Sequence, residues 1–122
     1  MKKLFLPLIL LVAIAPAYAQ SVQEGNKQIY YERYESAENI FRTLTQQQGS
    51  NDEAWLGLTR SVLLQKKQLD PNVLYNAPSE VHDQPYYRIA RGYLLLNQNK
   101  KDSAMVYFES ALKQTKNKDE DV

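Results

Sequence analysis

The chain of 122 residues contains no cysteine and only one histidine, His82. Without cysteine there can be no disulfide and no thiolate ligand, so stability has to come from burial of a core. The four glycines are scattered, and no glycine-rich loop exists that could cradle a phosphate group. Lys and Arg (15) nearly balance Asp and Glu (14), so there is no basic excess of the kind that nucleic-acid binding requires.

The segment 1–19 differs in composition from the rest of the chain. Two lysines are followed by an apolar run over residues 4–14 and by a small-x-small cleavage signal at 17–19. This order is typical of a secretory signal peptide cut before Gln20. The run is shorter than the ~20 apolar residues that span a bilayer, so we expect no stable membrane insertion after cleavage. We expect an exported protein, with the periplasm as the first choice and the extracellular space as the second.

A motif recurs in the chain at a fixed offset of 67 residues, in which a glycine, an alanine and a phenylalanine keep the same spacing. The offset is close to twice 34, so a middle unit is expected between the two copies. Self-similarity of this kind is typical of stacked helical repeats and favours a binding scaffold over a catalytic pocket. The motif residues are Gly25, Ala37 and Phe41 in the first copy and Gly92, Ala104 and Phe108 in the second.

This spacing resembles the tetratricopeptide repeat (TPR) family, whose 34-residue unit is a pair of antiparallel helices. Trp55 and Ala111 fill further positions of the family motif. The resemblance implies an all-α fold, a right-handed α-solenoid of about three helix-hairpin units over residues 20–116, and then a charged tail at 117–122. The basic start and the Ala-x-Ala cleavage site add the expectation of an exported bacterial protein. The implied units are 21–48, 51–84 and 85–116.

The middle unit departs from the family pattern. In the register set by Trp55, Thr59 falls where the family has glycine, and Pro71 falls where it has alanine. We therefore expect an intact first helix and a broken second helix in this unit. In the complete units a small residue on each helix would let the backbones approach at the crossing. Phe41 would then fill the space toward the next hairpin.

Apolar periodicity and turn residues predict six helical segments. Gly49 is expected to cap the C-terminus of the second segment, and Ser50 with Glu53 is expected to form a capping box for the third. Asp70 is expected to begin the fourth segment, and Asp83 the fifth. The expected segments are 23–31, 34–47, 52–67, 71–76, 85–96 and 100–114.

The family resemblance also implies a binding groove, because the first helix of each unit lines a concave face that binds extended peptides. Asn26 and Arg60 would hold a peptide backbone or a carboxylate, and the tyrosines would be anchors, since tyrosine offers a large area and a hydroxyl group. The partner implied is a protein or peptide segment. The implied groove residues are Asn26, Tyr30, Leu56, Arg60, Leu63, Tyr86, Ile89 and Tyr93.

We therefore expect a non-catalytic protein–protein interaction scaffold without cofactor or metal. One alternative is a structural slice of a longer repeat array or an envelope assembly factor. A more remote alternative is a hydrolase that uses His82. Glu80 and Asp83 flank this histidine, but no nucleophile motif lies nearby, so a solvated loop histidine is expected instead. One imidazole with two adjacent carboxylates would make only a weak metal site, so no metal site is expected here.

The last predicted helix carries an apolar stripe that only the short charged tail could cover. Such a stripe at the end of a repeat array tends to find a partner. We therefore expect self-association through the C-terminal hairpin, or continuation of the array in a longer protein. The stripe consists of Ala104, Tyr107, Phe108, Ala111 and Leu112.

Overall fold

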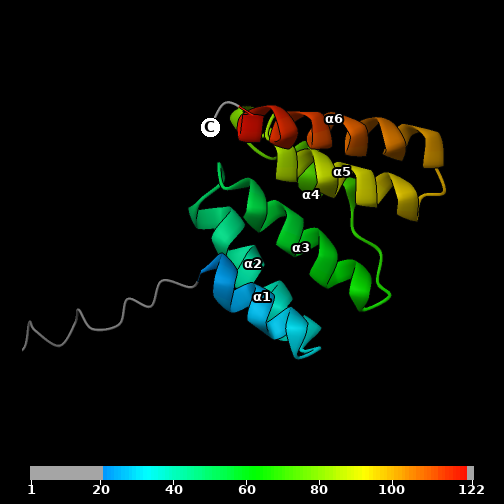
Figure 1. Ribbon diagram of the computed structural model, residues 1–122. Helices are drawn as coiled ribbons and strands as arrows, with labels where there is room; N and C mark the ends of the chain where they lie inside the picture. Colours follow the sequence, from blue (N-terminus) through cyan, green and yellow to red (C-terminus); the bar gives the residue numbers. More distant parts are fainter. Residues whose placement is uncertain (1–20, 121–122) are drawn as a thin grey trace, which may run out of the picture.

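The computed structural model describes the backbone of residues 21–120 and the side chains of residues 21–116, so the expected signal peptide at 1–19 lies outside the described residues. The fold is all-α, as expected, and the described residues contain no strand (Figure 1). The elements are α1 (Val22–Tyr30), α2 (Tyr34–Gln47), α3 (Asp52–Leu64), α4 (Pro71–Tyr75), the 3-10 helix η2 (Ser79–Val81), α5 (Pro85–Asn97) and α6 (Lys101–Glu120).

Two helix pairs flank a central helix. Helices α1 and α2 pack side by side as one pair, and α5 and α6 pack as the other. Helix α3 lies between the pairs, where it packs against α2 and α1 on one side and against α5 on the other (Figure 1). The short α4 and η2 connect α3 to α5, which is the region where a broken helix was expected.

The helix boundaries follow the apolar periodicity most closely in α2, which spans the predicted residues 34–47. Helix α3 ends at Leu64, before the predicted end at residue 67, because Lys66 takes a left-handed backbone conformation with φ 63°. Helix α6 passes the predicted end at residue 114 and continues to Glu120. Part of the expected tail at 117–122 is therefore helical.

Only one of the predicted helix caps is present. The Asp70 carboxylate accepts a hydrogen bond from the Asn72 amide at 3.0 Å, as expected for a residue that begins a helix. The capping box is wrong, because Asn51 is the N-cap of α3 and makes no side-chain capping bond, while the Ser50 hydroxyl donates to Glu80 instead. Gly49 is not the cap of α2, because the helix ends at Gln47, its C-cap residue is Gln48, and no glycine has a positive φ.

The N-terminus of α5 is capped across the molecule and not by a neighbour in sequence. Asp83 was expected to cap it, but Gln84 is the N-cap residue and makes no side-chain capping bond. The Tyr86 amide instead donates to the Asp52 carboxylate at 2.9 Å. This bond joins the start of α3 to the start of α5 and fixes the relative position of the two helices.

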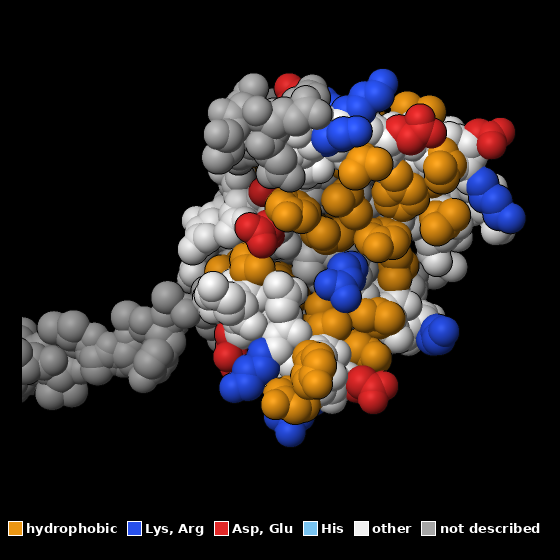
Figure 2. Space-filling view, viewed as in Figure 1, with side chains coloured by type: hydrophobic (Ala, Val, Ile, Leu, Met, Phe, Trp, Pro, Cys, Tyr) orange, Lys and Arg blue, Asp and Glu red, His pale blue; other side chains and the backbone are white. Residues whose placement is uncertain are grey.

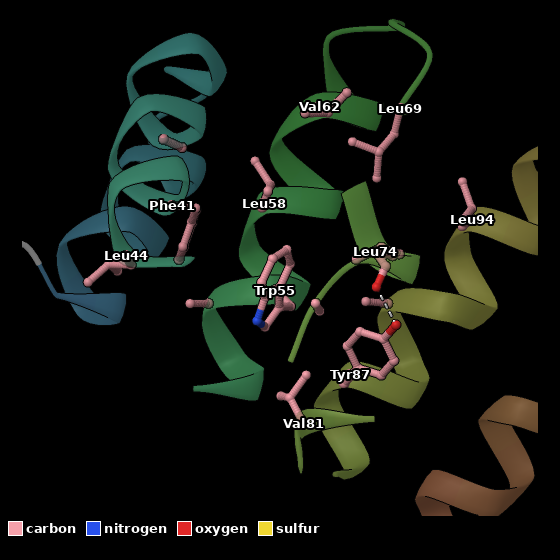
Figure 3. Close-up of a cluster of buried hydrophobic side chains, with 14 residues drawn as sticks. Phe41, Leu44, Trp55, Leu58, Val62, Leu69, Leu74, Val81, Tyr87 and Leu94 are labelled. Carbon is pink, nitrogen blue, oxygen red and sulfur yellow. Dashed lines mark hydrogen bonds between the residues drawn. The ribbon is translucent and has the colours of Figure 1, made fainter. Parts of the chain in front are cut away.

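The hydrophobic core runs from the α1–α2 pair through α3 to α5 (Figure 3). Trp55 lies at its centre, and the indole Nε1 donates to the Gly49 carbonyl oxygen at 2.9 Å. The buried Tyr87 hydroxyl donates to the Leu74 carbonyl oxygen at 2.6 Å, the bond dashed in Figure 3. Both polar groups are therefore paired, as burial of aromatic side chains requires.

Phe41 is fully buried between two glycines on different helices. A Cβ atom at Gly25 of α1 or at Gly57 of α3 would lie far inside van der Waals contact with its ring. The aromatic ring therefore occupies the space that two missing side chains leave open, and the three helices approach closely. Gly57 was not among the motif residues, because the family register places the glycine of this unit at Thr59.

Candidate functional site

A shallow hollow lies where α1, α3 and α5 meet, and half of the expected groove residues line it. Its volume is about 190 Å³. Leu56 and Arg60 come from α3, which places them one turn apart on the same helical face. The lining residues are Val22, Asn26, Glu53, Leu56, Gly57, Arg60 and Tyr86.

A second hollow of about 330 Å³ begins on the other side of Arg60. Leu63 and Leu64 of α3 and Tyr93 of α5 complete its lining, and three of its four residues were expected in the groove. Since Arg60 lines both hollows, they are neighbours along α3. We call the surface formed by Asn26, Leu56, Arg60, Leu63, Tyr86 and Tyr93 the groove face.

A third hollow of about 420 Å³ lies on the α5–α6 pair and is mainly apolar. Two expected groove residues line it, Ile89 and Tyr93, and Tyr93 also lines the second hollow. Figure 2 shows hydrophobic side chains gathered over α5 and α6 and continuing onto α3. The other residues that line this hollow are Leu96, Phe108, Ala111, Leu112 and Thr115.

Tyr30 does not belong to these hollows, although the family register placed it in the groove. It is 79% exposed at the end of α1 and packs edge-on against Tyr31, with ring centroids 5.2 Å apart. Asn26, one turn earlier on α1, lines the first hollow, whereas Tyr30 is the last residue of α1.

Arg60 is the charged residue at the centre of the groove face. Among the described residues no carboxylate forms an ion pair with it, although three other ion pairs are present. Its side chain is half-buried, so the aliphatic stem packs while the guanidinium group can reach a ligand. A guanidinium group in this position can bind a carboxylate or a carbonyl oxygen with two parallel hydrogen bonds.

His82 has a structural environment. Its ring stacks on Tyr87 at a centroid distance of 4.7 Å, and Nε2 lies 3.0 Å from the Ala77 carbonyl oxygen. The solvated loop histidine that the sequence suggested is therefore a half-buried packing residue. Ser110 lines the same hollow, but its hydroxyl accepts a hydrogen bond from Arg88, and no described residue links it to His82.

Metal ligands do not gather in the part of the chain that the structure describes. No group of three or more His, Cys, Asp or Glu side chains is close enough there to hold an ion, and this includes Glu80, His82 and Asp83. Another hollow, of about 650 Å³, has the carboxylates Asp52 and Glu53 in its lining. The Asp52 carboxylate already accepts the Tyr86 amide hydrogen bond.

Glu38 is a buried charged residue that the sequence analysis did not single out. It is 7% exposed and accepts hydrogen bonds from Gln65 at 2.7 Å, Lys67 at 2.9 Å and Arg42 at 2.8 Å. Burial alone would raise the pKa of this carboxyl group, but the three donors outweigh burial and lower its pKa to about 2. Glu38 therefore ties α2 to the turn that follows α3.

Arg91 is a second residue whose structural role was not predicted from the sequence. Its guanidinium group lies over the Tyr75 ring at 4.7 Å and over the Tyr107 ring at 5.0 Å. Such contacts between a cation and an aromatic ring stabilise the packing of α4, α5 and α6. Tyr107, which was expected in the apolar stripe of the last helix, therefore lies against Arg91, away from the hollow that Phe108 and Leu112 line.

Comparisons with protein families, with curated proteins and with solved structures found no match to this chain. Among the described residues, no helix is both long enough and apolar enough to cross a lipid bilayer.

Proposed function

We propose that this chain is a non-catalytic interaction scaffold of the TPR type, which binds an extended segment of another protein on its groove face. The observation that carries the proposal is the pair of neighbouring hollows on either side of Arg60. The 67-residue repeat supports the TPR-like arrangement, since helix pairs stand at both ends of the chain and α3 stands between them. We further propose export to the periplasm, on the composition of segment 1–19.

The lining of the two hollows suggests the chemistry of the bound segment. Arg60 lacks an ion-pair partner among the described residues and so favours a carboxylate between two apolar side chains. One apolar side chain would pack on Leu56 and Tyr86, and the other on Leu63 and Tyr93. The Asn26 amide can pair with the backbone of an extended peptide, which offers both a donor and an acceptor. The expected ligand pattern is apolar, acidic, apolar.

A peptide selection tests this proposal without knowledge of the natural partner. A random peptide library is selected on the mature chain and counter-selected on the Arg60→Glu variant. We expect enriched peptides with an acidic residue between apolar residues, and we expect Arg60→Glu to weaken their binding by about tenfold or more, because attraction becomes repulsion.

The matched control is Arg33→Glu, another exposed basic residue, which is the N-cap of α2 and lies outside the groove face. The control chain should bind the selected peptides as the unchanged chain does. Peptides without an acidic residue, or peptides that bind the Arg60→Glu variant equally well, would count against the groove face as the binding site. A library that yields no peptide above the counter-selected background would also count against it.

A second candidate function is that of a structural slice in a larger helical array or envelope assembly. The observation in its favour is the apolar hollow on α5 and α6, where hydrophobic side chains face solvent. The expected self-association through the C-terminal hairpin would use the same surface. No observation favours the hydrolase alternative, since the His82 Nε2 atom is beside the Ala77 carbonyl oxygen.

A further inference from the structure

The two copies of the repeated motif differ in what covers them. In the first copy, α3 packs against the α1–α2 pair and covers Phe41. In the second copy, Gly92 lies against Phe108 in the same way that Gly25 lies against Phe41, but no described helix follows on the other side of the ring. Phe41 is fully buried, whereas Phe108 is only half-buried and lines an open hollow.

The two copies differ most in the exposure of the residue one helical turn after each phenylalanine. Leu112 and Thr45 are equivalent, because they are 67 residues apart. Thr45 is 8% exposed, and Leu112 is 66% exposed. We call the surface formed by Ile89, Leu96, Phe108, Ala111 and Leu112 the end face.

The open surface is as apolar as the covered one. Leucine stands at position 112 where the covered copy has Thr45, and Ala111 stands where the covered copy has Leu44. A hairpin that ends a helical stack in water normally has a polar outer face. A contiguous apolar surface with a hollow of about 420 Å³ indicates contact with another molecule.

We propose that the end face binds an amphipathic helix of another protein, in the same way that α3 covers the α1–α2 pair. The internal copy supplies the template for the ligand. Helix α3 packs against the Phe41 ring with Gly57, where a side chain would collide with the ring, and Figure 3 shows the buried Leu58 on the side of α3 that faces α2. The bound helix therefore carries a glycine or an alanine against Phe108, followed by a large apolar residue.

A second copy of this chain fits the end face less well. Its helical glycines already lie against Phe41 or Phe108, and every alanine of the described range is buried. No described helix therefore presents a glycine or an alanine to solvent. This is why the proposal names a helix of a different protein, and why self-association is an outcome that overturns it.

The chain itself provides the probe for the test. A peptide with the sequence of residues 51–67 can be held helical by a hydrocarbon staple between positions 52 and 59, which lie two turns apart on the face opposite Gly57. Fluorescence anisotropy of the labelled peptide measures binding to the mature chain. We expect saturable binding that is lost when Gly57 of the peptide is replaced by leucine.

Two variants of α6 decide whether the peptide binds at the end face. Leu112→Lys should weaken binding by about tenfold or more, since a charge replaces an apolar contact. Val106→Lys is the matched control, because Val106 is 67% exposed on the same helix but lines a different hollow. We expect the control to bind the peptide as the unchanged chain does.

Three results would overturn the proposal. The first is absence of binding by the stapled peptide, and the second is equal binding to the Leu112→Lys chain. The third is a dimer in sedimentation experiments that Leu112→Lys dissociates, which would assign the end face to a second copy. Arg60→Glu in the full chain should leave binding of the peptide unchanged. The proposal for the end face can therefore be refuted independently of the proposal for the groove face.

Discussion

Phe41 is the residue that explains the repeated motif in physical terms. Its ring lies between Gly25 and Gly57, so a single aromatic side chain joins α1, α2 and α3. The glycines are needed for space and not for backbone freedom, because none of them has a positive φ. The three left-handed residues are instead Glu32, Lys66 and Asn99.

The two motif glycines should respond differently to substitution by alanine. Alanine in place of glycine normally stabilises a helix interior by about 0.5–1 kcal/mol. At Gly25 the new methyl group would collide with Phe41, whose ring cannot move away because Gly57 lies on its other side. We expect Gly25→Ala to destabilise the protein by about 1–3 kcal/mol through overpacking.

At Gly92 the collision is with Phe108, whose ring can turn toward the open end face. Gly92→Ala should therefore destabilise the protein by less than about 1 kcal/mol. The urea midpoints of the two variants measure this difference. Equal losses of stability would show that Phe108 is as tightly confined as Phe41 and would contradict our description of the end face.

Helix boundaries and buried positions could be predicted from the sequence where they depend only on the spacing of apolar residues. The apolar positions of α2 repeat with the helical period, and the boundaries 34–47 follow from them. Gly57 was not predicted as a motif residue, because the family register assigns positions from their spacing along the sequence and places the glycine of this unit at Thr59. Contact with the Phe41 ring depends instead on how α3 crosses α2.

At the scale of elements, the contacts that fix the helices relative to one another are polar and distant in sequence. The Asp52 carboxylate accepts a hydrogen bond from the amide of Tyr86, 34 residues later. Glu38 of α2 binds Gln65 and Lys67 in the turn after α3. Neither contact could be predicted from local sequence, and the Glu38 contact also requires that α3 end at Leu64 and not at residue 67.

Glu38 should make stability depend on pH in a defined window. Its pKa falls from 4.5, the ordinary value expected in the unfolded chain, to about 2 in the folded protein. The contribution of Glu38 to stability is therefore complete above about pH 4.5 and is lost as the pH falls toward about 2. Since Arg42 and Lys67 are partly exposed, solvent screening reduces this contribution to about 1–3 kcal/mol.

Glu38→Gln should consequently destabilise the protein at neutral pH, and the difference from the unchanged chain should vanish as the pH approaches about 2. Urea unfolding across this range measures the difference. Glu35→Gln, an exposed position on the same helix, is the control and should change stability by less than about 0.5 kcal/mol. A Glu38→Gln effect that does not depend on pH would mean that the carboxylate charge is not what stabilises the contact.

At the scale of the whole molecule, helices from distant parts of the sequence assemble two exposed surfaces. The groove face combines α1, α3 and α5, and the end face combines α5 and α6. Seven of the eight groove residues that the family resemblance implies line one of the hollows on these surfaces. Tyr30 lines none of them, and it is the last residue of α1, whose end cannot be read from the helical period.

The central claim is that the groove face binds a protein segment. Backbone amide NMR of the mature chain, titrated with a peptide from the selection described above, tests it most directly. The account predicts saturable shifts that concentrate at Asn26, Leu56 and Arg60, and that disappear in the Arg60→Glu variant. Shifts confined to α6 or to the η2 region, or shifts that remain in the Arg60→Glu variant, would contradict it.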